Sequence, residues 1–346
     1  MSHANIVDMA NLDPKNVLGS VEMFLDQCEQ IWNESKSLQF PEGYGNCQNI
    51  VVCAMGGSAY GGYVVPALFK DQLKVPLLSN NDYHLPGFTN ENTLAILSSY
   101  SGGTEEVLSA KEEAQKRGLK ITGLTIGGEL ADFFKKDHIP SLVFDPKFNP
   151  SGQPRLGMGY MVLGVMAILN KLGMISVSDE EVNKAISEVR SNQEEIKEKA
   201  KQLAEKIKGS IPIIFSAEFL VGNAHILRNQ FNETSKSFSA FSPLPELNHH
   251  LMEGLKNPPD KKLFVLFISS DIYSDKLRKR VELTKDVVER NSVEWGEYQP
   301  SGSSKLSQVL NALSFGGFLT YFLAMLYGQD PSVIPWVDYF KEQLEK

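Results

Sequence analysis

The stretch Ser98-Ser99-Tyr100-Ser101-Gly102-Gly103-Thr104-Glu105-Glu106 joins two segments of different hydrophobic period. An apolar run, Thr93 to Leu97, precedes it, and Val107-Leu108-Ser109-Ala110 follows with the spacing of a helix. The stretch therefore predicts a turn from a buried strand into a helix. Hydroxyls, glycines and the free N–H groups of a helix's first turn can hold a phosphate, although serine and threonine also favour ordinary helix starts.

A similar turn, Gly56-Gly57-Ser58-Ala59-Tyr60-Gly61-Gly62, follows the apolar run Ile50 to Met55. A dinucleotide fingerprint needs a glycine where Ser58 or Ala59 stands, and a P-loop needs Lys-Ser/Thr after its last glycine. The chain also has no G-x-S-x-G elbow and no H-E-x-x-H motif. These observations disfavour a nucleotide enzyme and favour a small phosphorylated ligand held by two hydroxyl-rich loops.

Apolar runs and helical segments alternate along both halves of the chain, which indicates parallel sheets with ligands at the carboxyl ends of the strands. The strands expected besides Ile50 to Met55 lie at 75–79, 93–98, 119–126, 141–145, 211–216, 237–241, 263–268 and 293–298. The helices expected lie at 63–70, 104–117, 156–172, 220–229, 274–290 and 304–326, with one long charged helix from the capping box at Ser178 to near Gly209. A short helix near the C-terminus begins at the prolines of Asp330 to Pro335.

Two domains are expected from 346 residues. The loop Asn149–Pro154 marks their boundary, so we predict one domain over residues 1–152, with a helical lead-in, and a second over 153–346. A net charge of −8 disfavours nucleic-acid binding. Two apolar stretches, 156–169 and 315–327, fall short of a membrane span and are interpreted as buried helices. Three cysteines are too few for a disulfide framework or a metal motif, which favours the cytoplasm.

Titratable residues gather in the second half, at Asn232-Glu233 just after an expected helix and at Pro245-Glu246-Leu247-Asn248-His249-His250 after an expected strand. Glutamate and histidine in one cleft are common partners in moving protons on a sugar. Each of them also fits an ordinary surface position. The two histidines lack a third ligand at metal spacing, so no metal site is predicted.

Several of these motifs resemble one known family. Gly56-Gly57-Ser58 and Ser99 to Glu105 are similar to the two phosphate loops of the sugar isomerase (SIS) domain. Asn232 to Lys236 and Pro245 to His249 resemble the second-domain signature of the bifunctional phosphoglucose/phosphomannose isomerases. Gln153-Pro154-Arg155 and the tail from Asp330 to Lys341 resemble other elements of that family. The chain departs from the family's common residues at Gly103, Val107, Thr234 and Ser235.

The resemblance implies two tandem SIS-type, flavodoxin-like parallel-sheet domains and an aldose–ketose isomerase. Such an enzyme interconverts glucose 6-phosphate, and also mannose 6-phosphate, with fructose 6-phosphate through a cis-enediol(ate), without a metal or organic cofactor. It acts as a homodimer with shared active sites. The phosphate-binding residues it implies are Gly57, Ser58, Ser99, Ser101 and Thr104.

The resemblance also assigns the chemical roles. Glu233 shuttles a proton between C2 and C1, and Arg155 stabilises the enediolate. His249 and Lys341 open the sugar ring, and in relatives the histidine comes from the partner subunit. The motif alignment favours His249 over its neighbour His250, and the one-residue ambiguity stays open.

Two other functions fit parts of the sequence. A non-catalytic SIS regulator would bind a sugar phosphate and report it to a partner, but such proteins usually carry a basic DNA-binding head. The isomerase half of a glucosamine-phosphate synthase would need an N-terminal cysteine nucleophile, whereas the first cysteine here is Cys28, in an expected helix.

Overall fold

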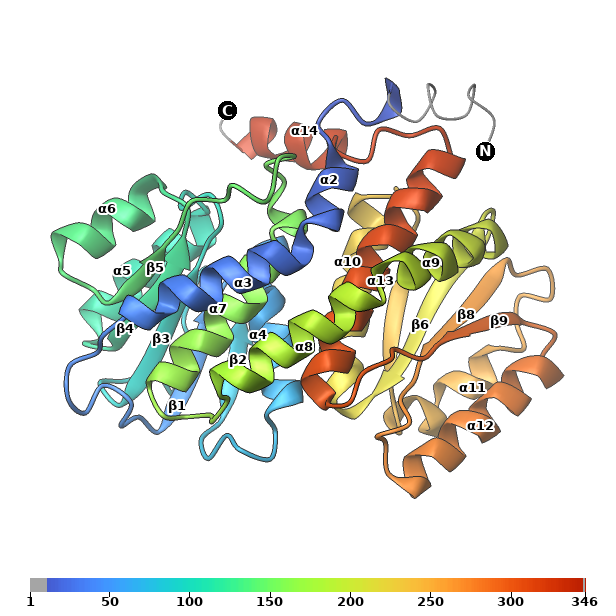
Figure 1. The fold of residues 1–346 in the computed structure, drawn as a ribbon, viewed down its shortest axis with the longest axis horizontal. Coiled ribbons are helices and arrows are strands. Elements are labelled where there is room, and N and C mark those ends of the chain that lie inside the picture. The colour runs from blue at the N-terminus through green and yellow to red at the C-terminus, as the bar shows by residue number, and fades with distance from the viewer. Residues whose placement is uncertain (1–10, 345) are drawn as a thin grey trace.

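A computed structural model describes residues 11–344 and 346, and it contains two parallel β-sheets with helices between and around them (Figure 1). Residues 1–10, which open the expected helical lead-in, lie outside the described residues. The first half comprises α2 (Val17–Glu22), α3 (Phe24–Glu34), η1 (Ser35–Ser37), β1 (Asn49–Cys53), η2 (Gly56–Ala59), α4 (Tyr60–Leu68), β2 (Leu77–Asn80), β3 (Thr93–Ser98), α5 (Glu105–Lys116), β4 (Lys120–Thr125), α6 (Gly128–Lys136) and β5 (Ser141–Val143).

The second half begins with η3 (Pro154–Leu156) and α7 (Met158–Lys171). It continues with α8 (Asp179–Ser191), α9 (Gln193–Ile207), β6 (Ile211–Ala217), η4 (Glu218–Leu220), α10 (Val221–Glu233), β7 (Ala240–Leu244), η5 (Glu246–His249), α11 (Leu251–Gly254), β8 (Leu263–Ile268), α12 (Asp275–Arg290), β9 (Glu294–Tyr298), α13 (Lys305–Leu326) and α14 (Pro335–Leu344).

The two sheets share the order of four strands, and the first sheet has a fifth strand at its edge. The first has the strand order β2-β1-β3-β4-β5 and the second has β7-β6-β8-β9, and every pair of neighbours is parallel. The predicted α/β class with two parallel sheets is therefore confirmed. The backbone repeats in detail as well, because Gly56 after β1 and Glu218 after β6 both have positive φ, +51° and +45°.

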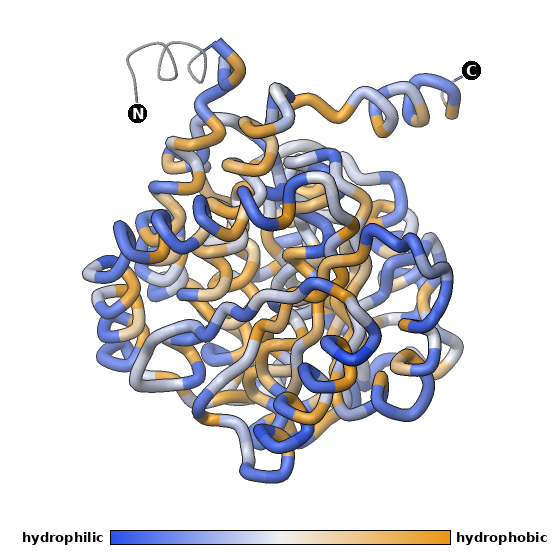
Figure 2. Tube along the Cα trace, turned by 90° about the vertical axis from the view of Figure 1, so that its right-hand side faces the viewer, coloured by the Kyte–Doolittle hydropathy of each residue, from blue (hydrophilic) through white to orange (hydrophobic). Residues whose placement is uncertain are grey.

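Alternate residues of β1 enter two different cores, which explains why its apolar run is continuous. Ile50 and Val52 belong to the large core that runs through both halves of the chain, whereas Val51 and Cys53 belong to a smaller core under α5 and α6. Covered faces on both sides are typical of parallel sheets. In the large core α4 packs against α7 and α10, and α13 packs against α9 and α10. Apolar residues accordingly concentrate in the interior of the molecule, and polar residues lie mostly at its surface (Figure 2).

Several expected elements differ from the observed ones. The long charged helix after Ser178 is two helices, α8 and α9, which meet at Asn192. The predicted capping box of α8 is confirmed, because Ser178 Oγ accepts from Glu181 N and Glu181 reaches back to Ser178 N. Strand β7 begins three residues later than predicted, and α6 was not predicted.

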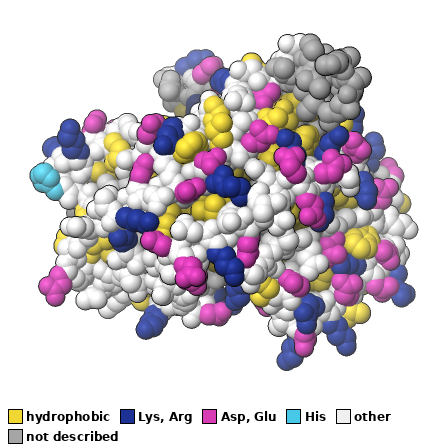
Figure 3. Space-filling view, in the orientation of Figure 1, with side chains coloured by type: hydrophobic (Ala, Val, Ile, Leu, Met, Phe, Trp, Pro, Cys, Tyr) yellow, Lys and Arg dark blue, Asp and Glu magenta, His cyan; other side chains and the backbone are white. Residues whose placement is uncertain are grey.

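The apolar stretch 315–327 belongs to helix α13, Lys305–Leu326, which lies where a helix was predicted, at 304–326. Among the described residues one helix, α13, is long and apolar enough to cross a membrane by length and composition, but its most apolar window is 89% buried inside the fold. Helix α13 is therefore buried as a core helix is. On the face drawn in Figure 3, acidic and basic side chains are interspersed.

Helix α7 follows the predicted domain boundary yet packs against α3 and β4 of the first half. Helix α14 lies apart from the body of the molecule, and none of its described residues is buried (Figures 1 and 2). The division at residue 152 remains a proposal about how the chain is organised.

Candidate active site

The glycine turn η2 lies directly against the segment that carries Arg155. A Cβ at Gly57 would lie 2.6 Å from the backbone nitrogen of Arg155 and 2.7 Å from the carbonyl carbon of Pro154. Only glycine lets η2 and η3 approach so closely. The first predicted phosphate loop and Arg155 therefore belong to one site.

Ser58 joins the two predicted phosphate loops. Its Oγ accepts a hydrogen bond of 2.8 Å from Tyr100 N, and its carbonyl oxygen accepts one of 2.7 Å from Ser98 Oγ. Both contacts are buried. The carboxyl ends of the neighbouring strands β1 and β3 are thus held together at the edge of the sheet where ligands of α/β proteins bind.

The second loop is closed by its own hydroxyls. Ser99 Oγ lies 2.7 Å from Thr104 Oγ1 and accepts from Gly102 N at 3.0 Å, and Thr104 is the residue before α5. Ser101 is exposed, whereas Ser99 is fully buried. Ser99 therefore shapes the loop, while Ser101, Thr104 and the first turn of α5 face a prospective anion.

The two glycine positions of the second loop differ in whether they have room for a larger side chain. Gly102 has a φ of +75°, and a Cβ there would lie 1.8 Å from the carbonyl oxygen of Gly127, so a larger residue cannot fit. A Cβ at Gly103 would meet no atom within 4 Å. The family's more common asparagine would fit at this position, so this departure leaves the loop intact.

Glu233 and Arg155 form an ion pair, with Glu233 Oε2 3.6 Å from Arg155 Nη1. Glu233 is the last residue of α10 rather than a residue after the helix, as the sequence suggested. The side chain of Arg155 is 1% exposed and that of Glu233 is 29% exposed. Arg155, which stands directly before an apolar helix, could also have been a solvent-facing residue at a helix start; that interpretation is wrong, because its guanidinium is buried.

The remaining donors of Arg155 bind neighbouring groups. Nε donates to Thr234 Oγ1 at 3.3 Å, and Nη1 donates to Gln153 Oε1 at 3.0 Å. Nη2 donates to the carbonyl oxygens of Pro331 and Ser332 at 2.7 and 2.9 Å. Arginine has five N–H donors, so these contacts leave one Nη1 donor for Glu233 or for a ligand beside it.

The surroundings of Glu233 favour a carboxylate that exchanges protons. Burial raises its pKa, and the positive charges of Arg155, Lys341 and Lys236, in that order, oppose the shift. Among residues 11–344 no donor forms a hydrogen bond with this carboxylate. A raised pKa and free oxygens suit a group that takes a proton from carbon and returns it.

Lys341 and His249 differ in their relation to the Arg155–Glu233 pair. The charge of Lys341 acts on Glu233 from the exposed helix α14. His249 is exposed at the end of η5, and the structure records no contact between it and Arg155 or Glu233 in the described part of the chain. Its neighbour His250 pairs with Glu246, Nε2 to Oε2, at 2.7 Å. The fold of one chain therefore brings the predicted phosphate loops, Arg155 and Glu233 together. Lys341 acts on Glu233 through its charge, and no contact of His249 with the pair occurs among the described residues.

Two further residues at the site were not predicted from the sequence. The φ of Lys236 is +53°, its Nζ donates to the carbonyl oxygens of Thr234 and Asp330 at 3.1 and 2.5 Å, and burial lowers its pKa to about 8. Tyr60 is fully buried, its hydroxyl has no hydrogen-bond partner among the described residues, and its pKa is raised first by burial and then by Glu233. The sequence signals were that Lys236 ends the motif Asn232 to Lys236 and that Tyr60 lies in the glycine turn 56–62.

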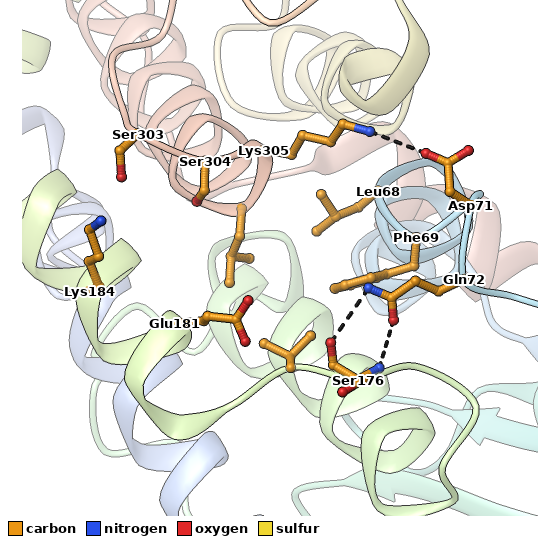
Figure 4. A pocket seen from close by; sticks show the side chains of 12 residues that line it. Leu68, Phe69, Asp71, Gln72, Ser176, Glu181, Lys184, Ser303, Ser304 and Lys305 are labelled. Atoms are coloured by element: carbon orange, nitrogen blue, oxygen red, sulfur yellow. Dashed lines mark hydrogen bonds and ion pairs between the residues drawn. The ribbon is translucent and has the colours of Figure 1, made fainter.

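A separate cavity of about 320 Å³ lies at the other end of α4, near Leu68 and Phe69 (Figure 4). Its polar side chains are already paired: Gln72 Oε1 accepts from Ser176 N at 2.7 Å, and Lys305 Nζ lies 3.3 Å from Asp71 Oδ2. The segment after α4 is thereby linked to the start of α13 by Asp71 and to the segment after α7 by Gln72. The cavity contains none of the predicted site residues.

No group of three or more His, Cys, Asp or Glu side chains suited to a metal ion occurs in the described ranges. The expectation that the reaction needs no metal remains a prediction for experiment.

Comparison with known proteins supports the same family. A family model described as the bacterial phospho-glucose isomerase C-terminal SIS domain matches residues 196–344. A bifunctional phosphoglucose/phosphomannose isomerase of Caldicellulosiruptor bescii is 31% identical over 339 residues, which cover 94% of this chain and 98% of the relative. One of Aquifex aeolicus is 33% identical over 301 residues, covering 86% and 91%. A D-glucosamine-6-phosphate 4-epimerase of Sulfolobus acidocaldarius is 26% identical over 71% of this chain and 76% of its own.

Solved structures share the fold at lower identity. A hypothetical protein from Thermus thermophilus superposes with a TM-score of 0.73 at 15% identity, covering 99% of this chain and 94% of that one. The C-terminal domain of glucosamine-fructose-6-phosphate aminotransferase from Francisella tularensis gives 0.69 at 14% identity, covering 91% and 97%. The identity to the Caldicellulosiruptor relative, over nearly the whole of both chains, shows that this chain belongs to the bifunctional phosphoglucose/phosphomannose isomerase family.

Proposed function

We propose that this chain interconverts glucose 6-phosphate and mannose 6-phosphate with fructose 6-phosphate through a cis-enediolate. The observation that carries the proposal is the Arg155–Glu233 pair at 3.6 Å, with the backbone of Arg155 packed on Gly57. A proton-exchanging carboxylate, a buried cation and an anion cradle thus lie side by side. The names of the curated relatives add weight to this choice of substrates.

The phosphate group binds at the ends of β1 and β3, against the two loops that contain Gly57, Ser58, Ser99, Ser101 and Thr104. The buried hydroxyls of Ser58 and Ser99 hold these loops in shape, and Ser101 and Thr104 are the more accessible donors. Backbone N–H groups at the start of α5 add to these hydroxyls. Binding this end of the sugar fixes the distance of C1 and C2 from Glu233, which lowers the entropic part of the barrier.

The chemistry begins with ring opening, in which His249 of the partner subunit and Lys341 serve as the acid and the base. The carboxylate of Glu233 then removes the proton from C2 and returns it to C1, so no net proton is gained or lost. Negative charge develops on the enediolate oxygens during this transfer. Arg155 stabilises that charge, because a guanidinium stays protonated at any relevant pH.

The active form in this proposal is a homodimer. Helix α14 exposes five large apolar side chains, Trp336, Val337, Tyr339, Phe340 and Leu344, which are 81, 40, 56, 62 and 59% exposed in the single chain. So much apolar surface on one helix is typical of an interaction site. A second copy that covers α14 and contributes His249 would complete a site that one chain leaves open.

The proposal also includes the setting, a cytoplasmic role in glycolysis and gluconeogenesis. The three cysteines support a reducing compartment, because Cys28, Cys47 and Cys53 are all free thiols.

A coupled assay with fructose 6-phosphate, glucose 6-phosphate and mannose 6-phosphate, run with and without EDTA, tests the proposal. Turnover of both aldoses in EDTA is the expected result. Turnover of glucose 6-phosphate alone would narrow the substrate range. Binding of a sugar phosphate without any turnover would contradict the isomerase and favour a regulatory SIS protein.

A further inference from the structure

The segment Asp330–Ser332 connects α13 to α14 and is bound from two sides by cations of the candidate site. Arg155 Nη2 donates to the carbonyl oxygens of Pro331 and Ser332, and Lys236 Nζ donates to that of Asp330. Three consecutive carbonyl groups are therefore held by two basic residues whose charges also act on Glu233. We call this segment the 330–332 anchor.

The anchor is also closed by its own side chains. Asp330 Oδ1 accepts from Ser332 N at 2.7 Å and from Ser332 Oγ at 2.6 Å, which is a turn that fixes the direction of the carbonyl groups. Pro331 and Ser332 are buried. Immediately after them the chain emerges, and no described residue of α14 is buried. Within one chain the position of α14 is thus set at the anchor.

Lys236 adopts an unfavourable backbone conformation to make its contact. A φ of +53° is rare for a residue with a long side chain and costs free energy that the surrounding structure must offset. This conformation directs the side chain back across the end of α10, where Nζ binds both Thr234 O and Asp330 O. Strained residues of this kind concentrate at functional sites, so the contact to the anchor calls for a functional explanation.

We propose that Lys236 is a positioning residue that acts through Lys341. It holds the 330–332 anchor against the end of α10, and the anchor in turn directs α14 so that Lys341 lies over Glu233. Arg155 binds the same anchor at the carbonyl groups of Pro331 and Ser332, so the pair of cations links the proton-transfer carboxylate to the helix that carries the ring-opening lysine. This inference rests on the proposed isomerase function.

A lysine near Glu233 could also act in a different way, through the direct effect of its charge on the carboxylate. The two roles predict different couplings between substitutions. A residue that acts only through Lys341 loses its effect once Lys341 is absent, whereas a residue that acts on Glu233 keeps it.

The experiment is a double-mutant cycle on kcat for fructose 6-phosphate formation, with Lys236→Met, Lys341→Met and the double variant. We expect each single variant to lose about tenfold or more in kcat with little change in KM, because the phosphate loops are untouched. The double variant should be within about twofold of Lys341→Met. If the kcat of the double variant fell by the product of the two single losses, the proposal would be overturned. Lys256→Met, an exposed lysine elsewhere, is the matched control and should match the wild-type protein.

Two further measurements keep the proposal testable if Lys236→Met folds poorly. Asp330→Ala removes the side-chain acceptor that closes the turn of the anchor but leaves Lys236 in place, and it should show the same non-additivity with Lys341→Met. Amide hydrogen exchange over residues 335–344 should be faster in Lys236→Met than in the wild type, and an unchanged rate would overturn the anchor role. If the wild-type protein shows no turnover, the proposed function fails while the exchange experiment still decides the anchor.

Discussion

Arg155 and Glu233 are separated by 78 residues in the sequence, yet their side chains pair at 3.6 Å in the interior of the fold. Arg155 precedes α7, which packs on the first sheet, and Glu233 ends α10, which packs on the second. The pair therefore forms only where the two halves meet. The cation and the carboxylate of the proposed reaction therefore meet at this junction.

Glu233→Gln should abolish isomerisation while sugar-phosphate binding persists. The amide keeps the size of the side chain but cannot accept a proton from carbon, so we expect kcat to fall about 10²- to 10⁴-fold. Binding of glucose 6-phosphate, measured by calorimetry, should change little because the phosphate loops remain. Retained turnover would remove Glu233 from the role of base.

Ser101→Ala combined with Thr104→Ala should weaken phosphate binding rather than chemistry. Hydrogen bonds to a charged ligand are worth about 1.5–3 kcal/mol each, so KM should rise roughly tenfold or more while kcat changes little. Ser274→Ala removes the corresponding hydroxyl before α12 in the second half and serves as the control. An unchanged KM in the double variant would show that the phosphate binds elsewhere.

His249→Ala should damage activity more than His250→Ala. We expect a loss of about 10²-fold for an acid–base group, whereas the exposed pair of His250 with Glu246 contributes little to stability. Steady-state kcat of the two variants provides the comparison. The reverse order would mean that the neighbouring histidine carries the role.

Tyr60→Phe should leave the protein as stable as the wild type or about 1 kcal/mol more stable. The Tyr60 hydroxyl is buried without a partner in the described chain, and such a group costs free energy that its removal recovers. Tyr273→Phe is a matched control, because the Tyr273 hydroxyl donates to Ala217 O at 2.8 Å and its removal should destabilise the protein. A clear loss of stability in Tyr60→Phe, measured by urea unfolding, would contradict an unpaired hydroxyl.

His225→Phe should make the protein less sensitive to acid. His225 is stacked between Tyr63 and Phe241, and burial, aided by Arg228, lowers its pKa to about 4. Its pKa in the unfolded chain is about 6.5, so the unfolded state binds the proton more readily. The neutral imidazole therefore contributes stability above about pH 6.5 that is lost as the pH falls toward 4.

Urea unfolding at pH 7 and at pH 4.5 measures this loss. The wild-type protein should lose more stability between the two values than His225→Phe, which keeps the ring stack. His138→Asn, at an exposed position with a φ of +54°, should lose as much as the wild type. An identical loss in His225→Phe would show that other groups cause the acid sensitivity.

Elements whose formation depends only on residues close together in the chain could be predicted from the sequence. Strands β3 and β8 lie where predicted, at Thr93–Ser98 and Leu263–Ile268, because a strand buried on both faces requires an unbroken apolar run. The capping box at Ser178 was predictable because its two hydrogen bonds span only three residues. Strand β7 was placed too early because Pro243 disfavours a strand, whereas pairing with β6 extends it to Leu244 at the edge of the sheet.

The sequence by itself determined the α/β alternation, the two hydroxyl-rich turns and, through its motifs, the family. Tertiary structure alone decided that Arg155 is buried, that its Nη2 binds the carbonyl groups of residues 331 and 332, and that Lys236 turns back toward Asp330. Local periodicity reports which face of an element is apolar. It carries no information on contacts across 94 to 177 residues, which arise only when two sheets and their helices pack into one core.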